Sequence, residues 1–281
     1  MSSIPVQLTT SCSSFRYSIF PCSLHSRPSE LGFGNNFNVT ENTLDAFSKG
    51  IARGATSIEF TSRRSLDGRI ALIHNEKVED DEGKEIVVEK TNFADLPTGT
   101  LELDDALQFV MDRDVSFNIM MQNNPLEEGY DDSYRIALDV VDRIMNAGIS
   151  HRALVTAFDE GTVGAAKEAC GEDEDCSAMF GWLVMKLNPI RIMTPEDYRN
   201  VLGKYNLDAL IPEGELVLSS ETSLLDVFNE YEIPVFIWWM GVGTPSRENL
   251  KDLKTLACKG VGGFITPRVR IAVLTQKTNE C

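Results

Sequence analysis

The sequence predicts an α/β fold, and within that class an eight-stranded (β/α)8 barrel of the TIM type. Two observations lead to this prediction. Short apolar segments rich in β-branched and aromatic residues alternate with amphipathic segments of helical length, and the alternation continues along nearly the whole chain. A doubly wound open sheet is the alternative, although the sequence contains no glycine-rich phosphate loop of the GxGxxG type.

Nine segments have the composition of strands that are covered on both faces. They are residues 16–24, 57–63, 69–74, 115–122, 153–158, 178–185, 207–213, 233–240 and 262–267. A barrel of this type has eight strands, so one segment is expected to be a hairpin partner or to lie outside the barrel. The turn at Asp67 and Gly68 is too short to hold a helix, which makes the pair 57–63 and 69–74 the irregular place.

Seven segments between these strands carry apolar residues on one helical face. The first has Leu44, Phe47 and Ile51 on that face and ends at a glycine. Thr40 can act as its N-cap, with Glu41 favourable in the first turn, and a role of residues 41–43 in a pocket is the alternative. The motifs TPED and SREN supply similar caps to two later helices. The seven segments are residues 41–54, 103–114, 132–148, 160–170, 194–205, 220–231 and 246–260.

Composition limits the domain organisation and the partners. The 281 residues show no linker, so residues 16–275 are expected to form one barrel domain after a poorly ordered segment, residues 1–15. The net charge of −17 disfavours nucleic acid and anionic membranes as main partners. No run reaches the roughly 20 apolar residues of a membrane span. The sequence gives no indication of the oligomeric state.

The N-terminus and the cysteines bear on the cellular compartment. No apolar signal segment follows Met1, which favours the cytoplasm, whereas the Ser- and Thr-rich, acid-free first 29 residues make an organelle the alternative. Six cysteines show no metal-binding spacing. Cys170 and Cys176 flank an acidic loop and are close enough for a local disulfide, but reduced thiols are expected in a chain without a secretion signal.

Four motifs occur in a specific order and spacing: ENTLDAF (41–47), EFTSRRSLDG (59–68), RIALIHN (69–75) and NIMMQ (118–122). In these motifs the chain resembles the glycerophosphodiester phosphodiesterases, whose motifs read ENT, ExDVRLTKDG, VxxIHD and NIEIK. The later segments VTAFD, VFIWWM and GVGGFITP follow the family in the same order. The resemblance extends from the first predicted strand to the last.

The resemblance implies cleavage of phosphodiesters with a divalent cation, magnesium or calcium, that neutralises charge on the phosphoryl oxygens. In the family the cation is held by both carboxylates of ExD and by the glutamate of NIEIK. Two histidines, from an early HRG motif and from HD, serve as acid and base. Carried over to this chain, Glu59 is the first cation ligand and His74 is the histidine of HD. The implied partner is a small phosphodiester or another phosphate-bearing ligand.

The chain departs from the family at most of these positions. Thr61 stands where the second carboxylate is expected, and Met120 stands where the third is expected. Asn75 replaces the aspartate that follows the histidine, and Gln122 replaces the lysine of NIEIK. The loss of charged ligands lowers the affinity for a cation by at least about a hundredfold, and a thioether is a poor ligand for magnesium.

The early HRG motif has two alignments. In the first, SELGFG (29–34) lies on the family motif, which puts Glu30 in the place of the histidine. In the second, His25 is the histidine and the loop that leads to Glu41 is longer. The first alignment keeps the usual distance to the ENT motif and is preferred for that reason.

These departures predict a remodelled site. Glu59 and Glu41 are expected to be the remnant of a cation site, with no bound cofactor and with a binding or regulatory role for the barrel. The alternative is a divergent phosphodiesterase in which His74 is the acid or base. Arg63, Gln122 and Trp238 are the candidates for ligand contact, and Arg63, Arg64 or His74 could be the partner of Glu59. One of two adjoining tryptophans should face the barrel, and three methionines are expected to fill the core, namely Met111, Met120 and Met121.

Overall fold

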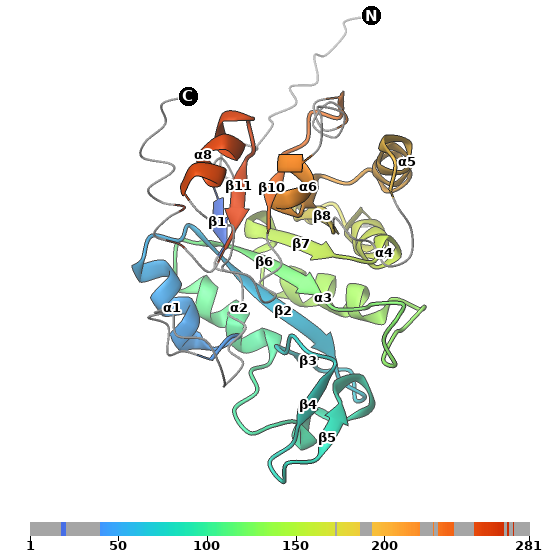
Figure 1. Ribbon diagram of the computed structural model, residues 1–281. Helices are drawn as coiled ribbons and strands as arrows, with labels where there is room; N and C mark the ends of the chain where they lie inside the picture. The colour runs from blue at the N-terminus through green and yellow to red at the C-terminus, as the bar shows by residue number, and fades with distance from the viewer. Residues whose placement is uncertain are drawn as a thin grey trace, which may run out of the picture.

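The computed structural model describes residues 18–20, 40–171, 173–185, 193–219, 227, 230–238, 250–266, 269 and 272. Eight parallel strands in these ranges form a barrel (Figure 1). They are β1 (Ser18–Phe20), β2 (Ser57–Arg64), β6 (Ser116–Met121), β7 (Ala153–Ala157), β8 (Met179–Val184), β9 (Ala209–Pro212), β10 (Phe236–Ile237) and β11 (Gly263–Ile265).

The strand order closes the ring. Strands β2, β6, β7, β8 and β9 are hydrogen-bonded in that order, and β11 pairs with both β1 and β10. Parallel bridges from Leu210 to Val235 and from Glu213 to Trp238 join β9 to β10, and β1 contacts β2. The predicted barrel is therefore confirmed.

The irregular strand pair is a hairpin, as predicted. Strand β3 (Ile70–Ala71) runs antiparallel to the end of β2, with Arg63 opposite Ala71. Gly68 has φ of +85° in the connecting turn, a backbone conformation that favours glycine. Strand β3 is shorter than the predicted segment 69–74, and the chain beyond Ala71 is irregular.

Helices cover the outside of the barrel (Figure 1). Thr194 caps one of them through a capping box with Asp197, as the TPED motif predicts. SREN lies outside the described residues, and the predicted helix 220–231 is described only in part. The helices are α1 (Leu44–Ala52), α2 (Leu103–Met111), α3 (Arg135–Asn146), α4 (Glu160–Gly171), α5 (Pro195–Tyr205), α6 (Gly214–Ser219), α8 (Leu250–Cys258) and the 3-10 turn η3 (Ser150–Arg152).

Helix α1 begins later than the sequence suggests. Its N-cap is Thr43, whose Oγ1 accepts a hydrogen bond from Ala46 N at 3.2 Å. Asn42 has φ of +53°, so the chain turns sharply just before the helix. The prediction that Thr40 is the cap and that Glu41 lies in the first helical turn was wrong. The positive φ of Asn42 interrupts a helical path from Thr40, so the helix begins after Thr43, whose hydroxyl caps it.

The strands bury different side chains on their two faces. Ile58 and Phe60 point outward to the helices, where the ring of Phe60 lies 4.9 Å from that of Phe47. The interior holds a separate apolar cluster that includes Met120, while Met121 belongs to the outer core. Met111 is 44% exposed at the end of α2, so its prediction as core filler was wrong.

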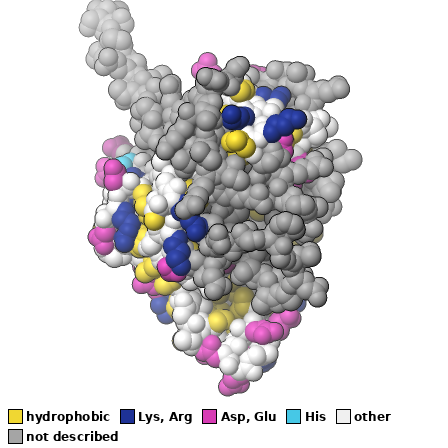
Figure 2. Space-filling model, turned by 60° about the vertical axis from the view of Figure 1, so that its left-hand side comes forward, with side chains coloured by type: hydrophobic (Ala, Val, Ile, Leu, Met, Phe, Trp, Pro, Cys, Tyr) yellow, Lys and Arg dark blue, Asp and Glu magenta, His cyan; other side chains and the backbone are white. Residues whose placement is uncertain are grey.

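An insertion between β3 and α2 forms a second small core. It contains β4 (Lys77–Glu79), β5 (Glu85–Val87) and the 3-10 turns η1 (Val88–Lys90) and η2 (Phe93–Asp95). Acidic side chains lie at the lower end of the molecule in Figure 2, the end at which Figure 1 places the β4–β5 hairpin. Within the described ranges, no helix is long and apolar enough to cross a membrane.

Cys170 and Cys176 form a disulfide between the end of α4 and the turn that leads to β8. The expectation of two reduced thiols was therefore wrong, and Cys258 is disulfide-bonded as well. The acidic loop between Cys170 and Cys176 brings the two cysteines together, which sequence spacing alone leaves open. Disulfides of this kind are typical of oxidising compartments.

Removing this disulfide is expected to destabilise the fold moderately. The bond closes a short loop, so Cys176→Ser should lower the free energy of unfolding by about 2 kcal/mol through the entropy of the unfolded chain. Urea unfolding of the variant and of the wild-type protein, without reductant, measures the difference. Equal midpoints, or a free thiol at Cys176 in the native wild-type protein, would contradict the pairing.

Candidate functional site

A chain of hydrogen bonds crosses three neighbouring strands inside the barrel. Asn118 Nδ2 on β6 donates to Glu59 Oε2 on β2 at 2.6 Å, and Thr156 Oγ1 on β7 donates to Asn118 Oδ1 at 3.0 Å. All three side chains are buried. The Glu59 carboxyl group thus takes part in a polar network that spans three strands, as a buried polar group requires.

Thr61 and Met120 lie opposite each other in the register of β2 and β6. Thr61 is fully buried, and its backbone N–H donates to Asn42 Oδ1 at 3.1 Å. Met120 packs in an apolar cluster with side chains of β7, β8, β9, β10 and β11, which are Leu154, Leu183, Ala209, Ile211, Phe236 and Ile265. The position of the family's third carboxylate is therefore part of an apolar interior.

The described part of the chain contains no group of three or more His, Cys, Asp or Glu side chains that is arranged to hold a metal ion. Asp159, which lies near the carboxyl end of β7, is engaged locally. Its Oδ2 accepts hydrogen bonds from Thr162 N and Thr162 Oγ1, both at 2.8 Å, so it caps α4. The three family cation positions offer one carboxylate, one hydroxyl and one thioether, a donor set that does not fit magnesium or calcium.

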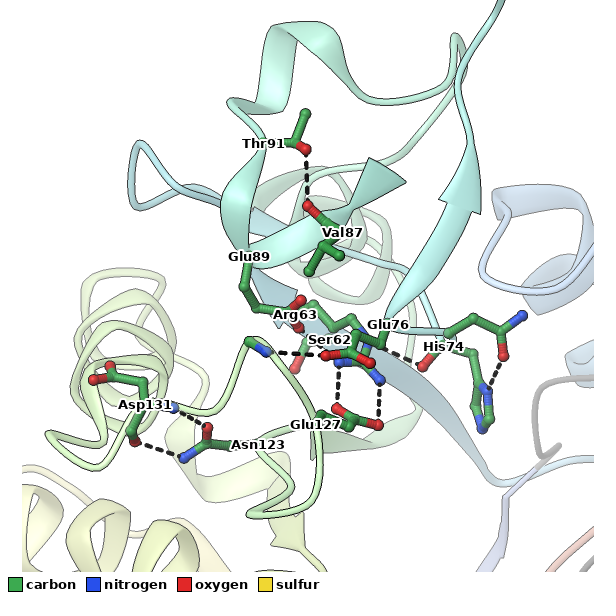
Figure 3. A network of polar contacts seen from close by, with 12 residues as sticks. Ser62, Arg63, His74, Glu76, Val87, Glu89, Thr91, Asn123, Glu127 and Asp131 are labelled. Carbon is green, nitrogen blue, oxygen red and sulfur yellow. Dashed lines mark hydrogen bonds and ion pairs between the residues drawn. The ribbon is translucent and has the colours of Figure 1, made fainter. Parts of the chain in front are cut away.

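Arg63 lies at the carboxyl end of β2 and is held on all sides (Figure 3). Its Nη1 donates to Glu89 Oε1 at 2.6 Å and to Glu127 Oε2 at 2.8 Å, and its Nη2 donates to Glu127 Oε1 at 3.2 Å. Its Nε donates to the backbone oxygen of His74 at 3.0 Å. Only 2% of the side chain is exposed. The carboxylates bound to Arg63 are those of Glu89 and Glu127, and Arg64 pairs with Asp139. Of the three partners considered for Glu59, both arginines are therefore paired elsewhere.

These carboxylates also account for the electrostatics of the cluster. Hydrogen bonds and charge from Glu127 and Glu89 raise the pKa of Arg63, although burial acts in the opposite direction and is the largest single cause. At Glu89, burial raises the pKa of the carboxyl group by more than the neighbouring charge and hydrogen bond of Arg63 lower it. Glu89 Oε2 is buried without a hydrogen-bond partner among the described residues.

The sequence suggested that His74 ends a strand. In the structure it lies in an irregular segment, three residues beyond the end of β3. Its ring is half-buried, and Nδ1 lies 3.2 Å from Asn75 Oδ1. The bond from Arg63 Nε to its backbone oxygen ties this segment to the end of β2 (Figure 3). The structure thus brings His74 and Arg63 together.

Two other candidates lie at the same end of the barrel. Gln122 follows β6 directly, and its backbone N–H donates to Ser62 O at 2.9 Å. Trp238 packs against the interior cluster, 5.3 Å from the ring of Phe158, and its Nε1 donates to Val184 O at 3.2 Å. Trp238 therefore faces the barrel interior, as was predicted for one of the two adjoining tryptophans. Trp239 lies outside the described residues.

Glu41 and Asn42 form a polar turn beside β2. Asn42 accepts the hydrogen bond from Thr61 N, while its Nδ2 is buried and has no partner among the described residues. Glu41 Oε2 is also buried without a partner there. Burial raises the pKa of Glu41 from its ordinary value of 4.5 to about 7. Glu41 is thus a carboxyl group that exchanges a proton near neutral pH.

Sequence reasoning missed several members of this site, namely Asn42, Glu89, Asn118 and Glu127. Asn118 had a usable signal, because it alternates with two apolar residues on a buried strand and so faces the interior. Glu89 and Glu127 had none, since they reach Arg63 from segments 26 and 64 residues away. Glu30 and His25, the two candidates for the HRG histidine, lie outside the described residues.

A family model matches residues 32–171, and its description is "Glycerophosphoryl diester phosphodiesterase family". A curated relative, the uncharacterized protein YqiK of Bacillus subtilis, is 28% identical over 139 residues. That match covers 43% of this chain and 57% of the relative, so the chain spans little more than half of the relative's length.

Solved structures share the fold. A phosphodiesterase of Oleispira antarctica, solved in complex with the product sn-glycerol-3-phosphate, matches with a TM-score of 0.67 at 12% identity, over 95% of this chain and 99% of that chain. A glycerophosphodiester phosphodiesterase of Thermotoga maritima matches with a TM-score of 0.60 at 18% identity, over 83% of this chain and 91% of that chain. A glycerophosphodiester phosphodiesterase of Agrobacterium tumefaciens matches with a TM-score of 0.62 at 14% identity, over 91% of this chain and 99% of that chain.

At these identities the structures establish the fold, whereas the family model rests on the sequence itself. The matched residues 32–171 include the ENT, ExD, histidine and NIEIK positions. By this match, carried on the barrel just described, the chain belongs to the glycerophosphoryl diester phosphodiesterase family.

Proposed function

We propose that this chain is a member of the family that binds a small phosphodiester or phosphate-bearing ligand in a binding or regulatory role and has lost cation-dependent cleavage. One observation carries the proposal. Glu59, the carboxylate that remains, accepts a hydrogen bond from Asn118 inside the barrel, and Met120 lies among apolar side chains.

The energetics support the same conclusion. A carboxylate within about 4 Å of a divalent cation contributes several kcal/mol even at an effective dielectric near 20. Thr61 and Met120 supply no charge, so Glu59 is the one carboxylate left at the three family positions. Each loss weakens cation affinity by at least about a hundredfold. A cation at millimolar concentration is then bound only marginally.

A second candidate function is metal-free phosphodiester cleavage, and one observation favours it. Burial raises the pKa of Glu41 to about 7, the range in which a general acid or base works at neutral pH. In this reading His74 is one of the acid–base pair and Glu41 is the other. Both residues lie in the part of the chain that the family model matches.

Calorimetric titration with magnesium, calcium and sn-glycerol 3-phosphate, run beside hydrolysis of glycerophosphodiesters, separates the two functions. We expect saturable binding of sn-glycerol 3-phosphate, no cation binding tighter than about 1 mM, and no turnover. The Thermotoga maritima enzyme serves as the positive control for the assay.

The alternatives predict different results in the same assay. Hydrolysis that a chelator abolishes would overturn the proposal and restore a cation site. Hydrolysis that survives chelation but is lost in both His74→Ala and Glu41→Gln would establish the metal-free reaction instead. Failure to bind sn-glycerol 3-phosphate or any glycerophosphodiester would reject the ligand class.

A further inference from the structure

The His74 segment has little regular structure to hold it. Strand β3 ends at Ala71, and the next residues form no strand until Lys77. Leu72 N donates to Leu101 O at 2.9 Å, which anchors the start of the segment. At His74 itself the backbone oxygen accepts the bond from Arg63 Nε. The Arg63 side chain is therefore one of the groups that hold the His74 backbone in place.

Arg63 is a rigid support for this bond. Four of its contacts are hydrogen bonds to Glu89, to Glu127 and to the His74 carbonyl, and its side chain is almost fully buried. The two oxygens of Glu127 accept from both terminal nitrogens, the forked geometry that fixes the plane of a guanidinium. A lysine in this position keeps the charge but has no Nε–H for the His74 carbonyl.

The carboxylates reach Arg63 from two separate segments. Glu89 belongs to η1 in the insertion, whereas Glu127 belongs to the loop between β6 and α3. This loop is partly exposed at Glu127, where 23% of the side chain is accessible. The orientation of the Arg63 guanidinium plane is therefore set in part by Glu127 of the β6–α3 loop.

Further contacts fasten that loop to the insertion. Glu128 forms ion pairs with Lys77 at 2.7 Å and with Lys90 at 3.0 Å. Gly129 N donates to Glu76 Oε1 at 2.9 Å. A Cβ atom at Gly129 would lie 2.6 Å from Glu89 Cδ, so the loop backbone packs directly on the Glu89 carboxylate. Loop and insertion thus meet around Arg63.

We propose that Arg63 is a positioning residue for His74 and that Glu127 makes this positioning depend on the β6–α3 loop. A displacement of the loop moves Glu127 away from Arg63. The guanidinium group can then rotate, and its hydrogen bond to the His74 carbonyl is lost. The loop and the imidazole then act as one unit in ligand binding. Only this last consequence rests on the proposed function, because the positioning itself involves no ligand.

Nuclear magnetic resonance of the histidine rings tests the positioning directly. The chain has three histidines, so long-range proton–nitrogen spectra are simple, and the spectrum of His74→Ala assigns the His74 signals. We expect Arg63→Lys and Glu127→Gln each to shift or split the His74 ring signals. The exposed ring of His151, in η3 at the opposite end of β7, should stay unchanged in both variants.

Matched variants control for general loosening. Arg64→Lys makes the same chemical change at the next strand residue, which pairs with Asp139. Asp139→Asn removes the carboxylate that pairs with Arg64, and so makes at the neighbouring arginine the change that Glu127→Gln makes at Arg63. Both controls should leave the His74 signals in place. Unchanged His74 signals in folded Arg63→Lys, or in folded Glu127→Gln if the first variant does not fold, would overturn the proposal.

Binding of sn-glycerol 3-phosphate to the same variants tests the consequence for the ligand. Arg63→Lys should weaken binding by about tenfold relative to Arg64→Lys, the scale expected when a contact residue is misplaced. A wild-type chain that does not bind this probe refutes the proposed ligand class but leaves the positioning result standing. Moved His74 signals with unchanged affinity would reject the link between the loop and the ligand.

Discussion

Replacement of Arg63 by methionine is expected to lower the free energy of unfolding by about 3–5 kcal/mol at pH 7. Arg63 is 2% exposed and neutralises Glu89, of which only 12% is exposed. The methionine fills much of the volume but leaves the Glu89 carboxylate buried without a counter-charge. Urea unfolding followed by circular dichroism measures the loss.

Arg64→Met is the matched control for this prediction. Arg64 is the next residue of the same strand and pairs with Asp139, but both side chains are partly exposed. Its loss should cost no more than about 1 kcal/mol. In the double variant Arg63→Met/Glu89→Gln, part of the lost stability should return because no charge is left buried at Glu89. Equal destabilisation by the two single arginine variants would contradict the argument.

Glu41→Gln is expected to make the protein more stable at alkaline pH, by up to about 3 kcal/mol. Burial raises the pKa of Glu41 from 4.5 to about 7, so the folded state favours the protonated carboxyl group. Glutamine resembles that neutral form and cannot ionise. The gain should appear as a higher urea midpoint of the variant at pH 8.

The direction of the pH dependence follows from the raised pKa. Below pH 4.5 the carboxyl group is protonated in both the folded and the unfolded states, so wild type and variant should be nearly equal. Between pH 4.5 and about 7 the unfolded state ionises first, and the wild-type protein loses stability relative to Glu41→Gln. Above pH 7 the group is ionised in both states, and the difference should stay constant.

Asp45→Asn provides the comparison for Glu41. Asp45 lies in the first turn of α1, and 62% of its side chain is exposed. Removing its charge should change the stability by less than about 1 kcal/mol at pH 8. A pH-independent difference between wild type and Glu41→Gln would show that Glu41 is not a buried, neutral-range carboxyl group. A Glu41→Gln midpoint below that of wild type at pH 8 would show the same.

Local patterns were sufficient for much of the architecture. The apolar run at 115–122 became β6 because a strand buried on both faces needs apolar residues at nearly every position. The Asp67-Gly68 turn indicated the hairpin of β2 and β3, since the short connection, residues 65–69, has no room for a crossover helix. Thr194 and Asp197 mark the start of α5 in the sequence because a capping box involves only neighbouring residues.

Long-range partners decided the site. Arg63 was a candidate for ligand contact, and its partners Glu89 and Glu127 meet it only after the insertion and the β6–α3 loop have folded. The same applies to Glu41, whose burial depends on a turn that hydrogen-bonds to β2 through Asn42. Periodicity in the chain carries no information on such pairings.

By itself the sequence determined the barrel, its hairpin and the family positions of Glu59, Thr61, His74 and Met120, because these depend on residue type and spacing along the chain. The tertiary structure alone decided that Glu59 is bonded to Asn118, that Arg63 is held by two glutamates and that Cys170 is joined to Cys176. The physical reason is that a buried charge must be satisfied by whichever polar groups the packed elements bring within reach, however distant they are in the sequence.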